Sequence, residues 1–209
     1  MLYGHYLELY SRLTTVIPET RLIHDDLRTL AFGTDASFYR LIPKLVVKVE
    51  NEKEVIAVLR GARALSLPLT FRAAGTSLSG QAISDSVLVL LGSSWTTRTI
   101  NGDASLITLQ PGVVGAHANA FLAPYKKKIG PDPASINSCM IGGIAANNSS
   151  GMCCGTAQNS YNTLAGMKII FVDGTTLDTN DQVSRASFLE SHSGMCRKIS
   201  DLAERVKRN

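Results

Sequence analysis

The sequence predicts a mixed α+β fold arranged in two lobes. Apolar residues at helical spacing alternate along the chain with short β-rich runs, a pattern typical of helices packed on sheets. Two glycine-rich stretches interrupt this pattern, and an Asp173-Gly174 pair separates two strand-like runs near the C-terminus. With 209 residues and a hydrophobic content of 44%, the chain can bury a sizeable core in one or two domains.

The first forty residues have the pattern of a helical arm. Apolar side chains recur at helical spacing over residues 2–16, and Pro18 ends that pattern. We expect a second helix over about 22–32, before a run of turn-forming residues that begins at Gly33.

A strand–helix–strand unit opens the first lobe. Residues 45–49 are expected to form a strand, and Asn51 then caps a helix in which Glu54 completes a capping-box pattern. A strand at 68–71 follows, so we expect a right-handed crossover between the two strands. The strand at 86–91 closes this lobe.

The second lobe is expected to start near Trp95, with a strand at 106–109 and a helix at about 114–123. The Asp173-Gly174 pair predicts a hairpin, and helices are expected at 183–190 and 195–207. The predicted division is a helical arm at 1–40, a domain at 41–180 with lobes at about 41–92 and 93–180, and at 181–209 the helical start of a link to a further domain.

The first glycine-rich stretch, Phe71 to Gln81, follows a strand and is suited to binding phosphate. Backbone amides in tight glycine turns converge on anions without needing a buried cation. Gly75 and Gly80 have the spacing of a P-loop, but Gln81-Ala82 stand where that motif needs Lys and Ser or Thr, so an NTPase is disfavoured. No G-x-G-x-x-G follows a strand, so a Rossmann fingerprint is missing too.

The second stretch runs from Ile129 to Gly151, and most of it belongs to a longer run without charge. From Ala134 through Met167 the sequence has no Asp, Glu, Lys, Arg or His. Such a segment has few groups for acid–base chemistry but many small residues whose backbone a flat ligand can approach closely. The two stretches together favour a site for a large cofactor with a pyrophosphate and an uncharged ring system.

Four segments taken together resemble the FAD-linked oxidase family: R-A-A-G-T-S-L-S-G-Q, G-P-D-P-A-S, I-G-G-I-A-A-N-N-S-S-G and G-M-K-I-I-F-V-D-G-T. The resemblance covers about residues 41–177 and is nearest to flavoenzymes of the D-lactate dehydrogenase and glycolate oxidase type. It implies the two-lobed α+β FAD-binding domain of the PCMH, or vanillyl-alcohol oxidase, type. It also implies that the Gly75–Gln81 loop holds the FAD pyrophosphate, while residues 131–151 line the flavin and its ribityl chain.

The expected cofactor residues are small or polar and lie in these two segments. They are Ala73, Ala74, Gly75, Thr76, Ser77, Gly80, Gln81, Pro131, Asp132, Ser135, Gly142, Gly143, Ala145, Asn148 and Gly151. Gln81 occupies the place where related flavoenzymes carry a tethering histidine, so we expect noncovalent FAD. A thioether through Cys153-Cys154 is an alternative, but free cysteines more often pack as small apolar residues.

Arg72 and the Asn147-Asn148 pair each allow two interpretations. Arg72 borders the phosphate loop and can either pair with the pyrophosphate or pack elsewhere in the fold. Asn148 can bond to the flavin edge, whereas its neighbour Asn147 is as well suited to satisfying the loop backbone.

The resemblance implies an oxidoreductase in which FAD takes a hydride from a D-2-hydroxy acid such as lactate or glycolate. It also implies that the base and the carboxylate clamp come from a C-terminal substrate domain, so no catalytic residue is assigned and we expect the chain to be an inactive fragment by itself. Two alternatives stay open: another flavin enzyme of the same fold, such as the reductase of a cell-wall precursor, and a non-catalytic FAD-carrying module. An electron acceptor or an iron–sulfur module is a possible partner.

Composition excludes several other classes. The net charge of +4, from 21 basic and 17 acidic residues, is mild, and no basic aromatic groove suggests nucleic-acid binding. The four histidines lack metal-binding spacing, and the four cysteines lack C-x-x-C spacing, so we expect no metal and a reducing compartment. Since neither a secretory signal nor a membrane-spanning run is present, we expect a cytoplasmic protein, with peripheral association at the inner face of the membrane left open.

Overall fold

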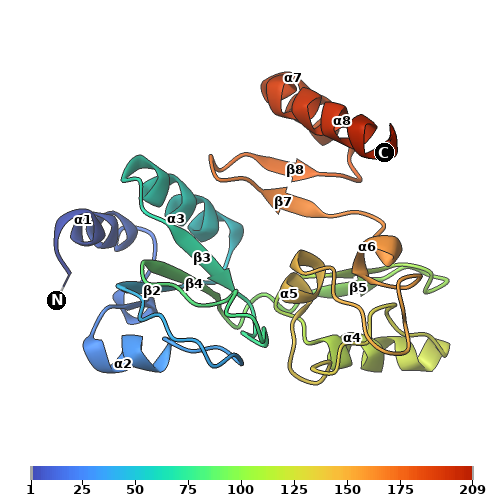
Figure 1. The fold of residues 1–209 in the computed structure, drawn as a ribbon, viewed down its shortest axis with the longest axis horizontal. Helices are drawn as coiled ribbons and strands as arrows, with labels where there is room; N and C mark the ends of the chain where they lie inside the picture. Colours follow the sequence, from blue (N-terminus) through green and yellow to red (C-terminus); the bar gives the residue numbers. More distant parts are fainter. Residues whose placement is uncertain (1, 209) are drawn as a thin grey trace.

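A four-stranded sheet forms the centre of the N-terminal half of the molecule (Figure 1), in a computed structural model that describes residues 2–208. Its strand order is β1 (Leu22–Ile23), β2 (Leu45–Val49), β4 (Val87–Leu91) and β3 (Leu69–Arg72). The last three strands are parallel, and β4 lies between β2 and β3. The aliphatic residues of the two inner strands, β2 and β4, are almost all buried, as expected of parallel strands covered on both faces.

Helices α1 (Gly4–Leu13) and α3 (Glu52–Ala64) pack together over this sheet. Leu9 and Leu13 from α1 and Val58 from α3 are at most 1% exposed and share one core with the sheet. These α1 residues are therefore part of the first lobe's core.

The helix expected over 22–32 is shorter than predicted. Leu22 and Ile23 instead form β1, which pairs antiparallel with β2, after a single 3-10 turn, η1 (Glu19–Arg21). Helix α2 (Asp26–Ala31) begins only after Asp25, whose carboxylate accepts the Arg28 amide at 3.0 Å. Burial of Leu22 and Ile23 against the sheet outweighs their helical spacing.

The second lobe combines a small antiparallel pair with short helices. Strands β5 (Arg98–Ile100) and β6 (Ile107–Leu109) form the pair, beside α4 (Gly115–Leu122) and the 3-10 turn η2 (Ala123–Tyr125). Helices α5 (Ile141–Ala146) and α6 (Ser160–Thr163) lie in the uncharged segment, which the sequence did not predict to be helical.

The Asp-Gly hairpin is confirmed: β7 (Lys168–Ile170) pairs antiparallel with β8 (Thr176–Asp178). The hairpin lies against α3 of the first lobe (Figure 1). Lys168 pairs with Glu52 at 2.6 Å, and Arg60 donates to the Asp173 carbonyl at 3.2 Å. The chain thus returns from the second lobe to the first.

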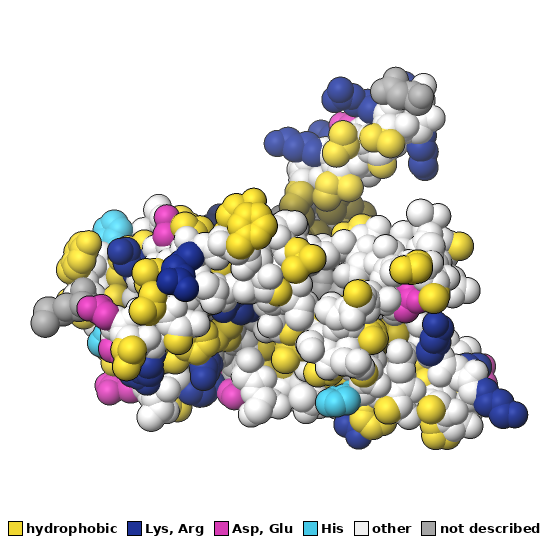
Figure 2. Space-filling model, turned by 60° about the horizontal axis from the view of Figure 1, so that its bottom comes forward, with side chains coloured by type: hydrophobic (Ala, Val, Ile, Leu, Met, Phe, Trp, Pro, Cys, Tyr) yellow, Lys and Arg dark blue, Asp and Glu magenta, His cyan; other side chains and the backbone are white. Residues whose placement is uncertain are grey.

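Two helices end the chain, α7 (Gln182–Ser191) and α8 (Ser193–Arg208). The first is held to the hairpin turn by a 2.9 Å contact between His192 Nε2 and an Asp173 oxygen. The second projects from the body of the molecule with apolar side chains exposed (Figure 2), among them Ile199, Leu202 and Val206. Within residues 2–208, no helix combines the length and the apolar character needed to cross a membrane.

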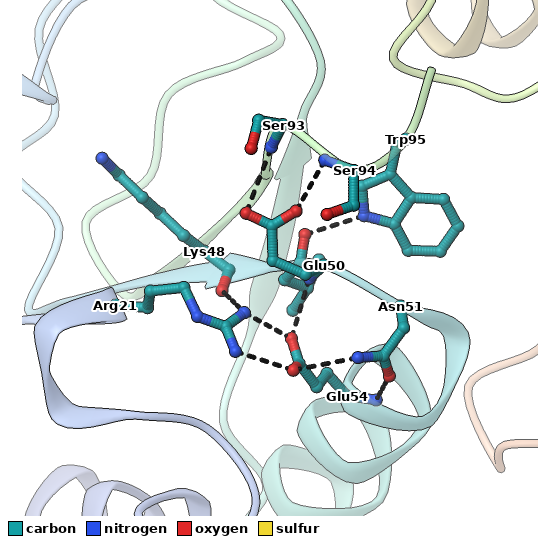
Figure 3. Close-up of polar contacts among 9 residues, drawn as sticks. Arg21, Lys48, Glu50, Asn51, Glu54, Ser93, Ser94 and Trp95 are labelled. Atoms are coloured by element: carbon teal, nitrogen blue, oxygen red, sulfur yellow. Dashed lines mark hydrogen bonds and ion pairs between the residues drawn. The ribbon is translucent and has the colours of Figure 1, made fainter. Parts of the chain in front are cut away.

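A polar network joins the sheet, α3 and the link to the second lobe (Figure 3). Arg21 and Glu54 form a two-pronged ion pair, with nitrogen–oxygen distances of 2.6 and 2.8 Å. The Glu50 carboxylate accepts the amides of Ser93 and Ser94 at 3.1 and 2.7 Å. Trp95 then buries its ring and donates to the Val49 carbonyl at 2.7 Å, which fixes the start of the second lobe.

Candidate functional site

The predicted phosphate loop, residues 73–81, lies in the connection between β3 and β4. Gly75 and Gly80 have backbone φ angles of 71° and 69°, in the left-handed region that favours glycine. At Gly80 a β-carbon would also lie 2.9 Å from a ring carbon of Tyr39. The loop therefore has a defined, tightly packed backbone.

Backbone donors of this loop are free for a ligand. Within residues 2–208, the amides of Gly75, Thr76 and Ser77 donate no hydrogen bond to the chain. The Ser77 hydroxyl, by contrast, is engaged locally, since it donates to the Gln81 side chain at 3.0 Å and accepts the Ser79 amide. Three consecutive unpaired amides in a half-exposed turn can bind an anion.

The Arg72 side chain is bonded to backbone carbonyls outside the phosphate loop. Its guanidinium is buried and donates to the carbonyls of Ala82, at 2.7 Å, and Phe32, at 3.0 Å. Burial lowers the pKa of Arg72, and the nearby Asp35 charge opposes that effect. Of the two interpretations of Arg72, its bonds favour a packing role.

In the second segment, Asp132 is used to hold the chain itself. One oxygen accepts the Cys154 amide at 3.1 Å, and Gly151 packs directly against the Asp132 side chain. Burial alone would raise the pKa of Asp132, but the hydrogen bonds from Cys154 and Cys153 outweigh it and lower that pKa. Pro131 is buried beside them.

Asn148 and Ser135 also shape the local backbone. Asn148 has a φ angle of 47°, and its side-chain oxygen accepts the Tyr161 amide at 3.0 Å, which leaves its amide nitrogen for a ligand. The Ser135 carbonyl accepts the amides of Ser138 and Cys139 at 2.7 and 2.8 Å.

Three more predicted residues, Gly142, Gly143 and Ala145, lie on α5. Gly142 packs against Pro111, and a β-carbon there would lie 2.9 Å from Pro111 Cβ. A β-carbon on Gly143 would lie 3.9 Å from Ala73 Cβ, at the start of the phosphate loop. The fold thus brings the two glycine-rich segments together between the lobes, on the side of α5 that faces the first lobe (Figure 1).

Sequence reasoning missed the segment between α2 and β2. Asp35 accepts the Ala82 amide at 3.3 Å, and Tyr39 contacts Gly80, so both lie at the phosphate loop. Since some forty residues separate these partners in the chain, no local pattern could have revealed the contacts. The described residues contain no cluster of three or more metal-ligating side chains.

Comparison with known proteins identifies the family. The family described as FAD binding domain matches residues 43–180. Glycolate oxidase subunit GlcD of Escherichia coli is 30% identical over 164 residues, which cover 77% of this chain and 33% of that protein. D-2-hydroxyglutarate dehydrogenase of Escherichia coli is 27% identical over 154 residues, which cover 72% of this chain and 15% of that protein. The chain therefore spans a third or less of the length of these relatives.

Solved structures agree on the fold. Alkyldihydroxyacetonephosphate synthase superposes with a TM-score of 0.70 at 17% identity, over 89% of this chain and 36% of that one. The expected α+β fold of the PCMH and vanillyl-alcohol oxidase type is thereby confirmed, as is FAD as the cofactor. The chain belongs to the FAD-linked oxidase family, as a protein with the FAD-binding domain of that family.

Proposed function

We propose that this chain is the FAD-binding portion of an oxidoreductase that dehydrogenates a D-2-hydroxy acid of the lactate or glycolate type. Bound FAD supplies the redox chemistry, by accepting a hydride from the carbon that bears the hydroxyl group. The substrate class is supported by the names of two relatives, a glycolate oxidase subunit and a D-2-hydroxyglutarate dehydrogenase, both of which act on 2-hydroxy acids.

The residues present fit FAD. Unpaired amides at Gly75, Thr76 and Ser77 suit the pyrophosphate, and the close approach of Gly143 to Ala73 places the uncharged segment directly beside that loop. This juxtaposition is the observation that carries the proposal. In it the phosphate loop binds and orients the cofactor, while the 131–151 segment shields the flavin from water with small side chains.

A substitution at Thr76 tests the pyrophosphate site. Gly80 suits this purpose poorly, because any side chain there is strained by the positive φ angle and meets Tyr39. If the pyrophosphate lies in this loop, a carboxylate in Thr76→Asp at about 4 Å from a phosphate oxygen would be repelled by about 4 kcal/mol at an effective dielectric constant of about 20. FAD affinity, measured by quenching of flavin fluorescence, should then fall about a thousandfold.

Thr76→Asn is the matched control, because asparagine has nearly the same size as aspartate and carries no charge. We expect its FAD affinity to stay within about tenfold of the original chain, since at most one neutral hydrogen bond changes. If Thr76→Asp bound FAD as tightly as Thr76→Asn, the pyrophosphate would have to lie away from this loop.

The substrate class is tested by anaerobic mixing with D-lactate, glycolate and D-2-hydroxyglutarate, and with L-lactate as the stereochemical control. Residues 134–167 offer no Asp, Glu, Lys, Arg or His to clamp a carboxylate or take the hydroxyl proton. General-base help contributes about 10²–10⁴-fold in rate, so the 209-residue chain loaded with FAD should not be reduced appreciably. If the longest product of its gene supplies those groups, D-lactate, glycolate or D-2-hydroxyglutarate should bleach its flavin absorbance. Reduction by NADPH and by none of these acids would contradict the proposal.

A further inference from the structure

We propose that residues 33–41, which connect α2 to β2, act as a brace for the phosphate loop, and that Asp35 and Tyr39 in this brace are positioning residues for FAD. The inference rests on the proposed placement of the pyrophosphate in the Gly75–Gln81 loop. It assigns a role to a segment that has neither regular secondary structure nor a place in the core.

The brace is closed on itself and touches the start of the loop. The Leu41 amide donates to the Gly33 carbonyl at 3.1 Å, so the two ends of the segment meet. The Ala36 amide donates to the Gly75 carbonyl at 2.9 Å. Because this bond holds the carbonyl of Gly75 toward the brace, it helps fix the peptide that carries the unpaired Thr76 amide.

Asp35 joins the brace to the end of the loop. Its two oxygens accept the Ser37 amide at 2.9 Å and the Ala82 amide at 3.3 Å. Burial acts to raise the pKa of Asp35, but the hydrogen bonds from Ser37 and Ala82 and the Arg72 charge lower it, so the group stays ionised. Arg72 donates to the Ala82 carbonyl, so the amide and the carbonyl of Ala82, at the end of the loop, are both hydrogen-bonded.

Tyr39 makes the third contact, at the turn that Gly80 forms. The Tyr39 ring covers the face of Gly80 on which a side chain would stand, with a ring carbon 2.9 Å from that position. The ring of its neighbour Phe38 is tilted against the Tyr39 ring, with centroids 4.7 Å apart, and Phe38 is 90% exposed. The loop is thus fixed at three points before any cofactor binds, which spares the cost of ordering it on binding.

Titration of the apo chain with FAD tests the brace. We expect Tyr39→Ala and Asp35→Asn each to weaken FAD binding about tenfold, through lost pre-organisation and a lost charged hydrogen bond. Tyr3→Ala, which removes a 74% exposed ring outside the brace, is the control and should change affinity less than about twofold. Tyr39→Phe keeps the ring over Gly80 and should restore affinity.

Two further measurements separate the possible failures. The urea midpoint of each variant, followed by Trp95 fluorescence, should stay near that of the original chain. If Tyr39→Ala lowered both the midpoint and the FAD affinity, and Tyr39→Phe restored neither, Tyr39 would have only a structural role and the inference would be overturned. Unaltered FAD affinity in both brace variants, with Thr76→Asp still weakened, would overturn the brace and keep the loop. Unaltered FAD affinity in Thr76→Asp would show that the pyrophosphate does not bind in this loop. The brace would then have no role in FAD binding either.

Discussion

Replacement of Glu54 by alanine tests the polar network that supports the first lobe (Figure 3). The Glu54 carboxylate is buried and accepts both terminal nitrogens of Arg21 and the Glu50 amide, the last at 2.7 Å. Without it, the Arg21 guanidinium keeps only the Lys48 carbonyl, at 3.1 Å, as a partner among the described residues. Removing one member of a buried ion pair costs about 3–5 kcal/mol, and because 21% of the Arg21 side chain reaches solvent we expect about 3 kcal/mol.

Urea unfolding measures this loss, with a reporter that the chain already contains. Trp95 is the single tryptophan, and its indole is buried and bonded to Val49, next to the network. Glu8→Ala is the matched control, because Glu8 forms an ion pair with Arg12 in which both side chains are 48% exposed. Such exposed pairs contribute at most about 1 kcal/mol.

The loss in Glu54→Ala should also depend on pH. Burial acts to raise the Glu54 pKa, but hydrogen bonds from Arg21 and Glu50 bring it below the ordinary value of 4.5. A carboxylate with a lowered folded pKa stabilises the fold fully above its unfolded pKa, and this contribution disappears as the pH falls through the folded value. The difference between Glu54→Ala and the original chain should therefore shrink below pH 4.5. A loss below about 1 kcal/mol at neutral pH, or one independent of pH, would refute the reasoning.

Two more outcomes are expected. Acid precipitation of the FAD-loaded chain should leave the yellow cofactor in the supernatant, since Gln81 cannot form a tether; flavin that stays in the pellet of the original chain but not of Cys153→Ala would instead reveal a thioether. Gly142→Ala should destabilise the fold by about 1–3 kcal/mol in urea unfolding, because its methyl group would meet Pro111. Gly102→Ala, where nothing lies within 4 Å of the new methyl group, is its control, and equal effects would argue against the contact.

Local signals in the sequence predicted the elements whose stabilising partners are close in the chain. Asn51 caps α3 as expected, since its side-chain oxygen accepts the Glu54 amide at 3.0 Å. The second hydrogen bond of a capping box, from the N-cap amide to the Glu54 side chain, is replaced by others. The Glu54 carboxylate accepts the Glu50 amide and the Asn51 side chain, and its main partner is Arg21, thirty-three positions away. The pattern predicted where the helix begins but not the ion pair.

Elements that depend on distant contacts were not predictable in the same way. Strand β1 has two residues, and it exists because Ile23 pairs with Val46 in the sheet. Helix α5 contains two glycines, which disfavour helices, and its first amides are satisfied by the carbonyls of Val113 and Pro111. Both glycine-rich segments could be found from composition, whereas their meeting at Ala73 and Gly143 needed the fold.

That meeting depends on how the first lobe holds the link to the second. Glu50 fixes the amides of Ser93 and Ser94, and Trp95 anchors the chain directly after them. On the proposed placement of FAD, a cofactor that contacts both the phosphate loop and α5 would favour the arrangement that this link holds, and the cofactor and the Glu50 contacts would then stabilise the same state. Because such coupling is reciprocal, whatever loosens the link must weaken FAD binding, and bound FAD must in turn stabilise the link. We therefore expect the affinity of the proposed site to depend partly on residues that never touch the cofactor.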